Sequence, residues 1–133
     1  MDFDRFVRQL KRFDHIGFSV ANFLKSRDFY VSALAPLDIA VIGEGENWAA
    51  FGENGHTLLW IGEGFGLPPG RIHVAFRARD RAAVNAFHAA ATEAGGVDNG
   101  APGLRPEYHP GYYAAFVLDP DGHNIEAVVH EKA

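Results

Sequence analysis

The stretch that decides the fold is Phe13–Leu34, FDHIGFSVANFLKSRDFYVSAL, because a loose copy of it recurs at Arg71–Thr92 as RIHVAFRARDRAAVNAFHAAAT. At one fixed offset His15 matches His73, and the flanking apolar residues match as well. In each copy, alternating apolar residues predict a strand, and helical spacing after a capping Asn or Asp predicts a helix. A duplicated unit with a histidine at the same place in each copy indicates two half-sites that build one site.

A second stretch also repeats, since WAAFGENGH at Trp48–His56 resembles YAAFVLDPDGH at Tyr113–His123. Asn54-Gly55 predicts a two-residue hairpin turn. Residues 97–111, rich in Gly and Pro, are expected to be mostly loop with one short strand. The sequence therefore predicts an α+β fold of two βαβββ modules, at about 12–64 and 70–130, forming a curved cup-like mixed sheet with helices on its convex side.

Composition restricts the classes of function. The 133 residues are expected to form a single domain, 1–133, with net charge −5 and no cysteine. The acidic balance without a basic stripe argues against a nucleic-acid partner, and no apolar run approaches the length of a membrane span. We expect a cytoplasmic protein with no secretory signal that acts on a small-molecule substrate.

A metal site is predicted from strand alternation and hairpin pairing. His15 and His73 lie opposite the apolar faces of their strands, so both are expected to point into the cup. If Leu118 pairs with His123, Ala115 lies opposite Glu126, a carboxylate on the concave face of the last strand. Two imidazoles and one carboxylate match a 2-His-1-carboxylate site for a divalent Fe, Mn, Zn, Ni or Mg ion. The alternative is that each histidine is a hydrogen-bonded core residue.

The same pairing assigns the remaining positions of the site. Leu59 stands where the duplication would place a fourth ligand, so three protein ligands are expected. Tyr113 is expected on the Glu126 face, and Tyr113 and His109 are candidates for proton transfer. In the alternative, His109 is a solvated loop residue. Arg105 is either solvated or a ligand of an anionic substrate.

The paired modules, the stretch FDHIGFSV and the ending YAAFVLDPDGHNIEAV resemble the vicinal oxygen chelate superfamily, over roughly Phe13 to His130. That group includes glyoxalase I, extradiol dioxygenases, fosfomycin-resistance thiol transferases and bleomycin-resistance proteins. The resemblance implies metal ligands at His15, His73 and Glu126, and a homodimer, sometimes with exchanged modules.

The function that this resemblance implies is a metal-dependent, glyoxalase-like lyase or isomerase, or a single-unit dioxygenase. Leu59 at the fourth-ligand position disfavours glyoxalase I activity itself. The alternatives are a thiol transferase of the fosfomycin-resistance type and a bleomycin-resistance-like binding protein. The retained triad disfavours the latter.

Overall fold

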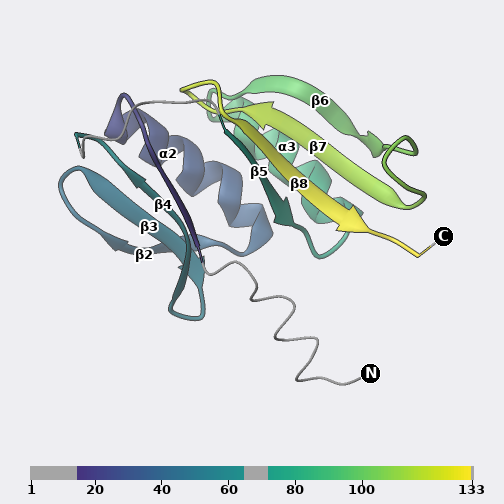
Figure 1. Cartoon of the computed structure of the whole chain (residues 1–133), viewed down its shortest axis with the longest axis horizontal. Coiled ribbons are helices and arrows are strands. Elements are labelled where there is room, and N and C mark those ends of the chain that lie inside the picture. The colour runs from purple at the N-terminus through teal and green to yellow at the C-terminus, as the bar shows by residue number, and fades with distance from the viewer. Residues whose placement is uncertain (1–14, 65–71, 133) are drawn as a thin grey trace.

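The computed structural model describes residues 15–64 and 72–132, which form two modules of the same order (Figure 1). Each module is a strand, a helix and three further strands. The first contains β1 (Ile16–Ser19), α2 (Phe23–Leu34), the 3₁₀ turn η1 (Ala35–Leu37), β2 (Ala40–Glu44), β3 (Trp48–Glu53) and β4 (His56–Gly62). The second contains β5 (His73–Arg77), α3 (Arg81–Glu93), β6 (Val97–Leu104), β7 (Tyr112–Leu118) and β8 (Asn124–His130).

Each module has its own four-stranded mixed sheet. The strand orders are β1-β4-β3-β2 and β5-β8-β7-β6. The first strand of each module runs parallel to the last one, and the other pairs are antiparallel. The predicted α+β fold of two βαβββ modules is confirmed, and β1 and β5 are edge strands of their sheets.

Local signals in the sequence explain where the helices and turns lie. The side chain of Asn22 accepts a hydrogen bond from the Lys25 amide, and that of Asp80 accepts one from the Ala83 amide, so both predicted N-caps are present. The β3–β4 hairpin turns at Asn54 and Gly55, both with positive φ, as the tight two-residue turn requires.

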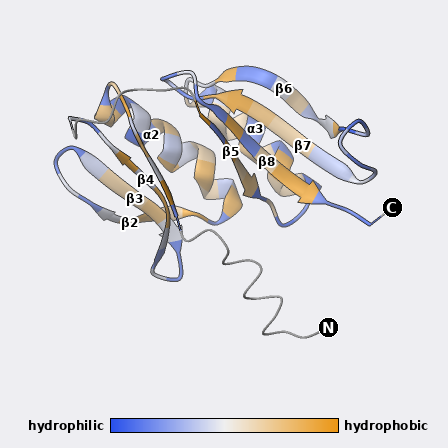
Figure 2. Cartoon of the chain, in the orientation of Figure 1, coloured by the Kyte–Doolittle hydropathy of each residue, from blue (hydrophilic) through white to orange (hydrophobic). Residues whose placement is uncertain are grey.

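The helix-facing sides of the two sheets share one core. Phe29 of α2, Phe87 of α3 and Ile125 of β8 are fully buried in it, and the two helices contact each other. The Tyr30 hydroxyl donates to Asp119 Oδ2 at 2.6 Å and so joins α2 to the β7–β8 turn. Figure 2 shows hydrophobic residues along β4, β7 and β8 and hydrophilic ones in the turns. Each sheet therefore turns its other face away from the shared core.

Strand β6 is longer than the sequence predicted. Residues 97–104 form an eight-residue strand, where we expected mostly loop. The strand lies at the edge of its sheet and its register shifts twice, near Gly100 and Gly103. An edge strand with bulges accommodates glycine, and it accommodates Pro102, which lacks an N–H group. The Gly and Pro content of residues 97–111 therefore led to a wrong prediction of the length of this strand.

The β7–β8 hairpin pairs one residue out of the predicted register. Leu118 pairs with Asn124, and Phe116, not Ala115, lies opposite Glu126. The Asp119 amide donates to the His123 carbonyl, so the loop contains three residues, 120–122, and Gly122 has a φ of 85°. Three-residue hairpin loops with a left-handed last residue are common. The prediction assumed a four-residue loop and was wrong by one residue.

Among residues 15–64 and 72–132, the helices are too short and too polar to cross a lipid bilayer.

Candidate metal centre

The candidate site lies on the face of the second sheet that is turned away from the core. Along β5, Val74 and Phe76 are buried, whereas His73 and Arg77 are exposed on the opposite face. Glu126 of β8 pairs with Ala75 and shares the face of His73. Its side chain is only 2 % exposed although it carries a carboxyl group. A buried carboxylate on this face requires polar partners.

Two side chains provide those partners. His73 Nε2 lies 2.9 Å from Glu126 Oε1. The hydroxyl of Tyr112, at the start of β7, donates a short hydrogen bond to Glu126 Oε2. The ring of His73 also stacks on Phe116, with 6.2 Å between the ring centroids. Both oxygens of Glu126 are thus engaged, and the carboxylate is held in one orientation.

The backbone carbonyl of Asn124 determines which ring nitrogen of His73 carries the proton when the ring is neutral. Nδ1 lies 3.1 Å from the carbonyl oxygen of Asn124, which can only accept, so Nδ1 carries the proton. In the neutral ring Nε2 then presents its lone pair to a carboxylate oxygen. Two acceptors at 2.9 Å repel each other unless a proton or a cation lies between them.

This arrangement fits a metal ion. Ligating histidines commonly donate their second ring N–H group to a carbonyl or carboxylate, which orients the ring as Asn124 does here. Two ligand atoms that are each about 2.1 Å from a shared ion, at right angles, lie about 3.0 Å apart. The distance between His73 Nε2 and Glu126 Oε1 matches that separation.

Tyr112 remains a neutral phenol at ordinary pH. Burial first, and then its hydrogen bond to Glu126, raise the pKa of Tyr112 well above its ordinary value of 10.0. A phenol that keeps its proton remains a donor to the carboxylate. Tyr112 therefore fixes Glu126 and retains a proton beside the candidate metal position.

The one-residue register difference changes which tyrosine reaches the site. Tyr113 points to the opposite face of the sheet, where its hydroxyl donates to Asn85 Oδ1 of α3 at 2.7 Å. The guanidinium of Arg81 lies over its ring, 4.6 Å from the centroid. The prediction that Tyr113 shares the face of Glu126 is wrong, and Tyr112 occupies that place.

His109 reaches the site through a second histidine. Its Nδ1 donates to the Pro110 carbonyl at 2.7 Å, and its Nε2 lies 3.0 Å from His130 Nδ1. The His130 ring lies against Tyr112, with 5.1 Å between centroids. Burial, followed by the positive charges of Arg77 and His109, lowers the pKa of His130. His130 was not predicted as a site residue, although it follows Glu126 at even spacing on β8.

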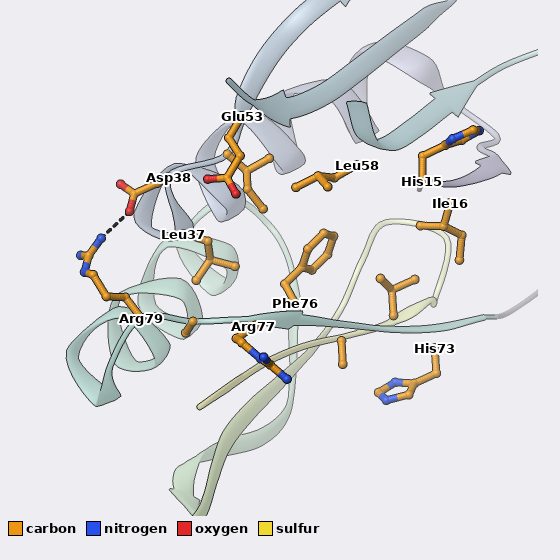
Figure 3. Close-up of a pocket in the computed structure, with 14 residues that line it drawn as sticks. His15, Ile16, Leu37, Asp38, Glu53, Leu58, His73, Phe76, Arg77 and Arg79 are labelled. Atoms are coloured by element: carbon orange, nitrogen blue, oxygen red, sulfur yellow. Dashed lines mark hydrogen bonds and ion pairs between the residues drawn. The ribbon is translucent and has the colours of Figure 1, made fainter. Parts of the chain in front are cut away.

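Within one chain, the ligand atoms of His15, His73 and Glu126 do not all lie within 4.8 Å of one another. His15 and His73 both line a cavity of about 780 Å³ that borders β5, η1 and the β3–β4 hairpin. Figure 3 shows the His15 ring turned away from His73, while Leu37, Leu58 and Phe76 point into the space between the modules. The structure thus brings together two of the three predicted ligands, His73 and Glu126.

The position equivalent to Glu126 in the first module is Trp60, not Leu59. Gly17 of β1 pairs with Trp60 in the same way as Ala75 pairs with Glu126. Leu59 is fully buried in the core. An indole does not ligate metals, and the residue at this position was misassigned by one.

A second group of side chains is spaced closely enough to hold a metal ion. Ligand atoms of Asp119, Asp121 and His123 lie within 4.8 Å of one another in the β7–β8 turn. However, His123 Nδ1 accepts a hydrogen bond from the Ile72 amide at 3.1 Å, so the proton of the neutral ring lies on Nε2. Asp119 Oδ1 accepts from the amides of Asp121 and His123. These bonds stabilise the turn and leave neither histidine nitrogen as a ligand.

Comparisons with known proteins agree with this architecture. The family described as Glyoxalase/Bleomycin resistance protein/Dioxygenase superfamily matches residues 12–127. A glyoxalase/bleomycin resistance protein from Albidiferax ferrireducens T118 is 26 % identical, with a TM-score of 0.76 over 90 % of this chain and 98 % of that one. No curated protein sequence matches the chain.

Two more distant structures share the fold. A glyoxalase-related enzyme from Fulvimarina pelagi is 19 % identical, with a TM-score of 0.70, and the match covers 90 % of this chain and 88 % of that one. The V278E mutant of glyoxalase I from Zea mays is 23 % identical, with a TM-score of 0.66 over 87 % of this chain and 45 % of that longer one. With its two βαβββ modules and the family match along most of its length, the chain belongs to the glyoxalase/bleomycin resistance protein/dioxygenase superfamily.

Proposed function

We propose that this protein is a divalent-metal-dependent enzyme that acts on a small substrate with two adjacent oxygens, as a glyoxalase-like lyase or isomerase or as a dioxygenase. The observation that carries the proposal is the 2.9 Å approach of His73 Nε2 to Glu126 Oε1, with His73 Nδ1 directed at the Asn124 carbonyl. The ligands in this proposal are His73, Glu126 and His15, and the ion is Fe, Mn, Zn, Ni or Mg.

When bound, a divalent ion acts as a Lewis acid that polarises the oxygens of a chelated substrate. The protein contributes orientation and proton transfer. Tyr112 holds Glu126 in place through its short hydrogen bond. His109 Nε2 and His130 Nδ1, 3.0 Å apart, would pass a proton between them, and the lowered pKa of His130 keeps that ring neutral near pH 7 and so able to accept one.

We further propose that the protein works as a homodimer in which His15 of one copy completes the site of the other. The support is that each sheet turns its ligand-bearing face away from the shared core and that the His15 ring is turned away from His73 (Figure 3). In a twofold-symmetric dimer, one pairing of faces would build both sites at once.

Metal binding is the direct test of the function. Full-length protein purified without a metal-affinity tag is stripped with a chelator and titrated calorimetrically with Zn²⁺ and with Mn²⁺. We expect one ion per chain, and loss of binding in His73→Ala and Glu126→Gln. His88→Ala is the matched control, because His88 pairs with Asp98 outside the site. Undiminished metal binding by His73→Ala would refute the site.

Complementation tests the dimer. If His15 acts in the partner's site, co-expressed His15→Ala and His73→Ala chains form mixed dimers with one complete site each. With random pairing, about a quarter of all sites would bind metal normally. If both histidines act within one chain, the mixture contains no complete site, and metal binding stays at the level of the separate variants.

An activity panel on the metal-loaded protein would identify the type of reaction. Catechols test ring cleavage, and a 2-oxoaldehyde with a thiol tests glyoxalase-like or thiol-transfer chemistry. The cavity of about 780 Å³ favours one second candidate, a binding protein for a small apolar molecule. Tight binding of such a molecule without metal uptake would support that candidate.

A further inference from the structure

The arginines of the described residues fall into two groups. Those away from the face of Glu126 each pair with a carboxylate, whereas Arg77 and Arg105, on that face, have no carboxylate partner within residues 15–64 and 72–132. The protein has an excess of acidic residues, so unpaired cations are not the result of a shortage of anions. The paired arginines are Arg27 with Glu44, Arg79 with Asp38, and Arg81 with Glu131.

Arg105 is held in a defined position over the sheet. One of its terminal nitrogens donates to the Ala101 carbonyl at 2.7 Å, and its guanidinium lies 5.4 Å from the centre of the Phe116 ring. A Cβ atom at Gly100 or Gly103 would approach the guanidinium to 3.2 Å, so these glycines make room for it. The cation is fixed by the backbone, and its other N–H groups remain available to a ligand.

This position borders the candidate metal centre. Phe116, which lies under Arg105, pairs directly with Glu126. The backbone amide of Arg105 also donates to the Tyr112 carbonyl at 2.7 Å, which ties Arg105 to the start of β7. Arg105 therefore lies on the β7 side of Glu126, with its guanidinium over the Phe116 ring that stands between them.

Arg77 lies on the other side of Glu126. It follows Ala75, the partner of Glu126, by two residues on β5, which is about 7 Å along the strand. Figure 3 shows Arg77 and His73 on the same side of β5 and Phe76 on the opposite side. Two guanidinium groups thus flank the carboxylate that would hold the metal.

We infer that the substrate of this site carries an oxyanion group, a carboxylate or a phosphonate, and that Arg105 binds it while Arg77 adds positive potential. The inference rests on the proposed function for the position of the reacting oxygens. Arginine matches planar oxyanions with paired donors, and its hold on Ala101 reduces the ordering cost of binding. A fixed cation in an acidic protein selects an anionic substrate where the overall charge would repel it.

The test uses two probes of the same shape, benzoate and benzamide, with the full-length protein. Binding is followed by calorimetry and by the side-chain Nε–H signal of Arg105 in NMR spectra. We expect benzoate to bind about tenfold more tightly than benzamide, as a charge-assisted hydrogen bond provides. Arg105→Gln should abolish this preference, and Arg77→Gln should reduce it by a smaller factor. Arg27→Gln, which removes the same charge from the first module, should leave it unchanged.

Several results would overturn the inference. These are equal binding of the two probes, no detectable binding of benzoate, a preference that survives Arg105→Gln, or a larger loss in Arg77→Gln than in Arg105→Gln. Measurements before and after metal removal separate this inference from the proposed function. A benzoate preference in a protein that takes up no metal contradicts only the metal centre, and metal uptake without the preference contradicts only the role of Arg105.

Discussion

Replacing Tyr112 by phenylalanine removes one hydroxyl that orients the candidate metal ligand Glu126. The ring remains, so its contacts with Tyr108, His109 and His130 persist. The neighbouring residue provides a matched control, because Tyr113→Phe is the same chemical change on the opposite face of β7. The two variants therefore differ only in which hydroxyl is lost.

The expected magnitude follows from what each hydroxyl contacts. Tyr112 donates to a carboxylate that is 2 % exposed, and loss of a residue that orients a metal ligand typically costs about 10- to 100-fold in metal affinity. That range is about 1.4 to 2.7 kcal/mol. Tyr113 donates to the amide oxygen of Asn85, so Tyr113→Phe should cost about 1 kcal/mol of unfolding free energy and leave metal affinity unchanged.

Competition titrations with a chromophoric chelator measure Zn²⁺ affinity, and urea denaturation measures the free energy of unfolding. Weaker metal binding in Tyr113→Phe, with normal binding in Tyr112→Phe, would show that the hairpin has the register predicted from sequence. Equal metal affinity in the parent and both variants would refute the role of Tyr112 in holding Glu126.

Three further predictions concern other parts of the fold. Tyr30→Phe removes the hydroxyl that donates a hydrogen bond to Asp119. Because this bond is buried and its acceptor is a carboxylate, we expect the free energy of unfolding, measured by urea denaturation, to fall by about 1.5 to 3 kcal/mol. A fall of less than about 0.5 kcal/mol would contradict this contact. The pKa of His130 in the folded protein is lowered below its ordinary value of 6.5. The stability that the neutral His130 ring contributes is therefore present above the pKa of the unfolded state, and it is lost as the pH falls toward the pKa of the folded state. An NMR titration should show that lowered midpoint, and Arg77→Gln should raise it; an unchanged midpoint in Arg77→Gln would show that the guanidinium does not act on the ring. Gly52→Ala should destabilise the β3–β4 hairpin far more than Gly55→Ala, since a Cβ at Gly52 would lie 1.8 Å from the His56 carbonyl oxygen whereas one at Gly55 meets nothing within 4 Å. Gly55 has a φ of 75°, so Gly55→Ala should still cost about 1 to 2 kcal/mol in thermal or urea unfolding.

The sequence was sufficient where structure depends on neighbouring residues. The caps at Asn22 and Asp80 and the turn at Asn54-Gly55 follow from side-chain and backbone chemistry over a few positions. The internal repeat then extended these local predictions to the whole fold. Strand alternation correctly put His73 on the face opposite the core.

The sequence did not predict the side chains correctly where a shift of one residue in strand register decides on which face of the sheet they lie. The turn after Leu118 allows a loop of three or four residues, and the choice depends on the hydrogen bonds that Asp119 makes with the turn amides. A shift of one residue exchanges the faces of Tyr112 and Tyr113. The same uncertainty misplaced the equivalent of Glu126 in the first module, where a register shift between Phe51 and Gly52 alters the count.

The sequence also did not predict how the two modules pack against each other. Both histidines were expected to meet in one cup, but the packing of α2 against α3 directs the ligand-bearing faces away from the shared core. How helices pack depends on contacts far apart along the chain, such as that between Tyr30 and Asp119. The repeat predicted two half-sites without indicating whether one chain joins them.

The most direct test of the central claim is an anomalous-scattering map from crystals of the full-length protein soaked with Zn²⁺. We expect one strong peak per chain, about 2.0 to 2.2 Å from both His73 Nε2 and Glu126 Oε1. A peak bound instead by Asp119, Asp121 and His123, or no peak beside Glu126, would contradict it.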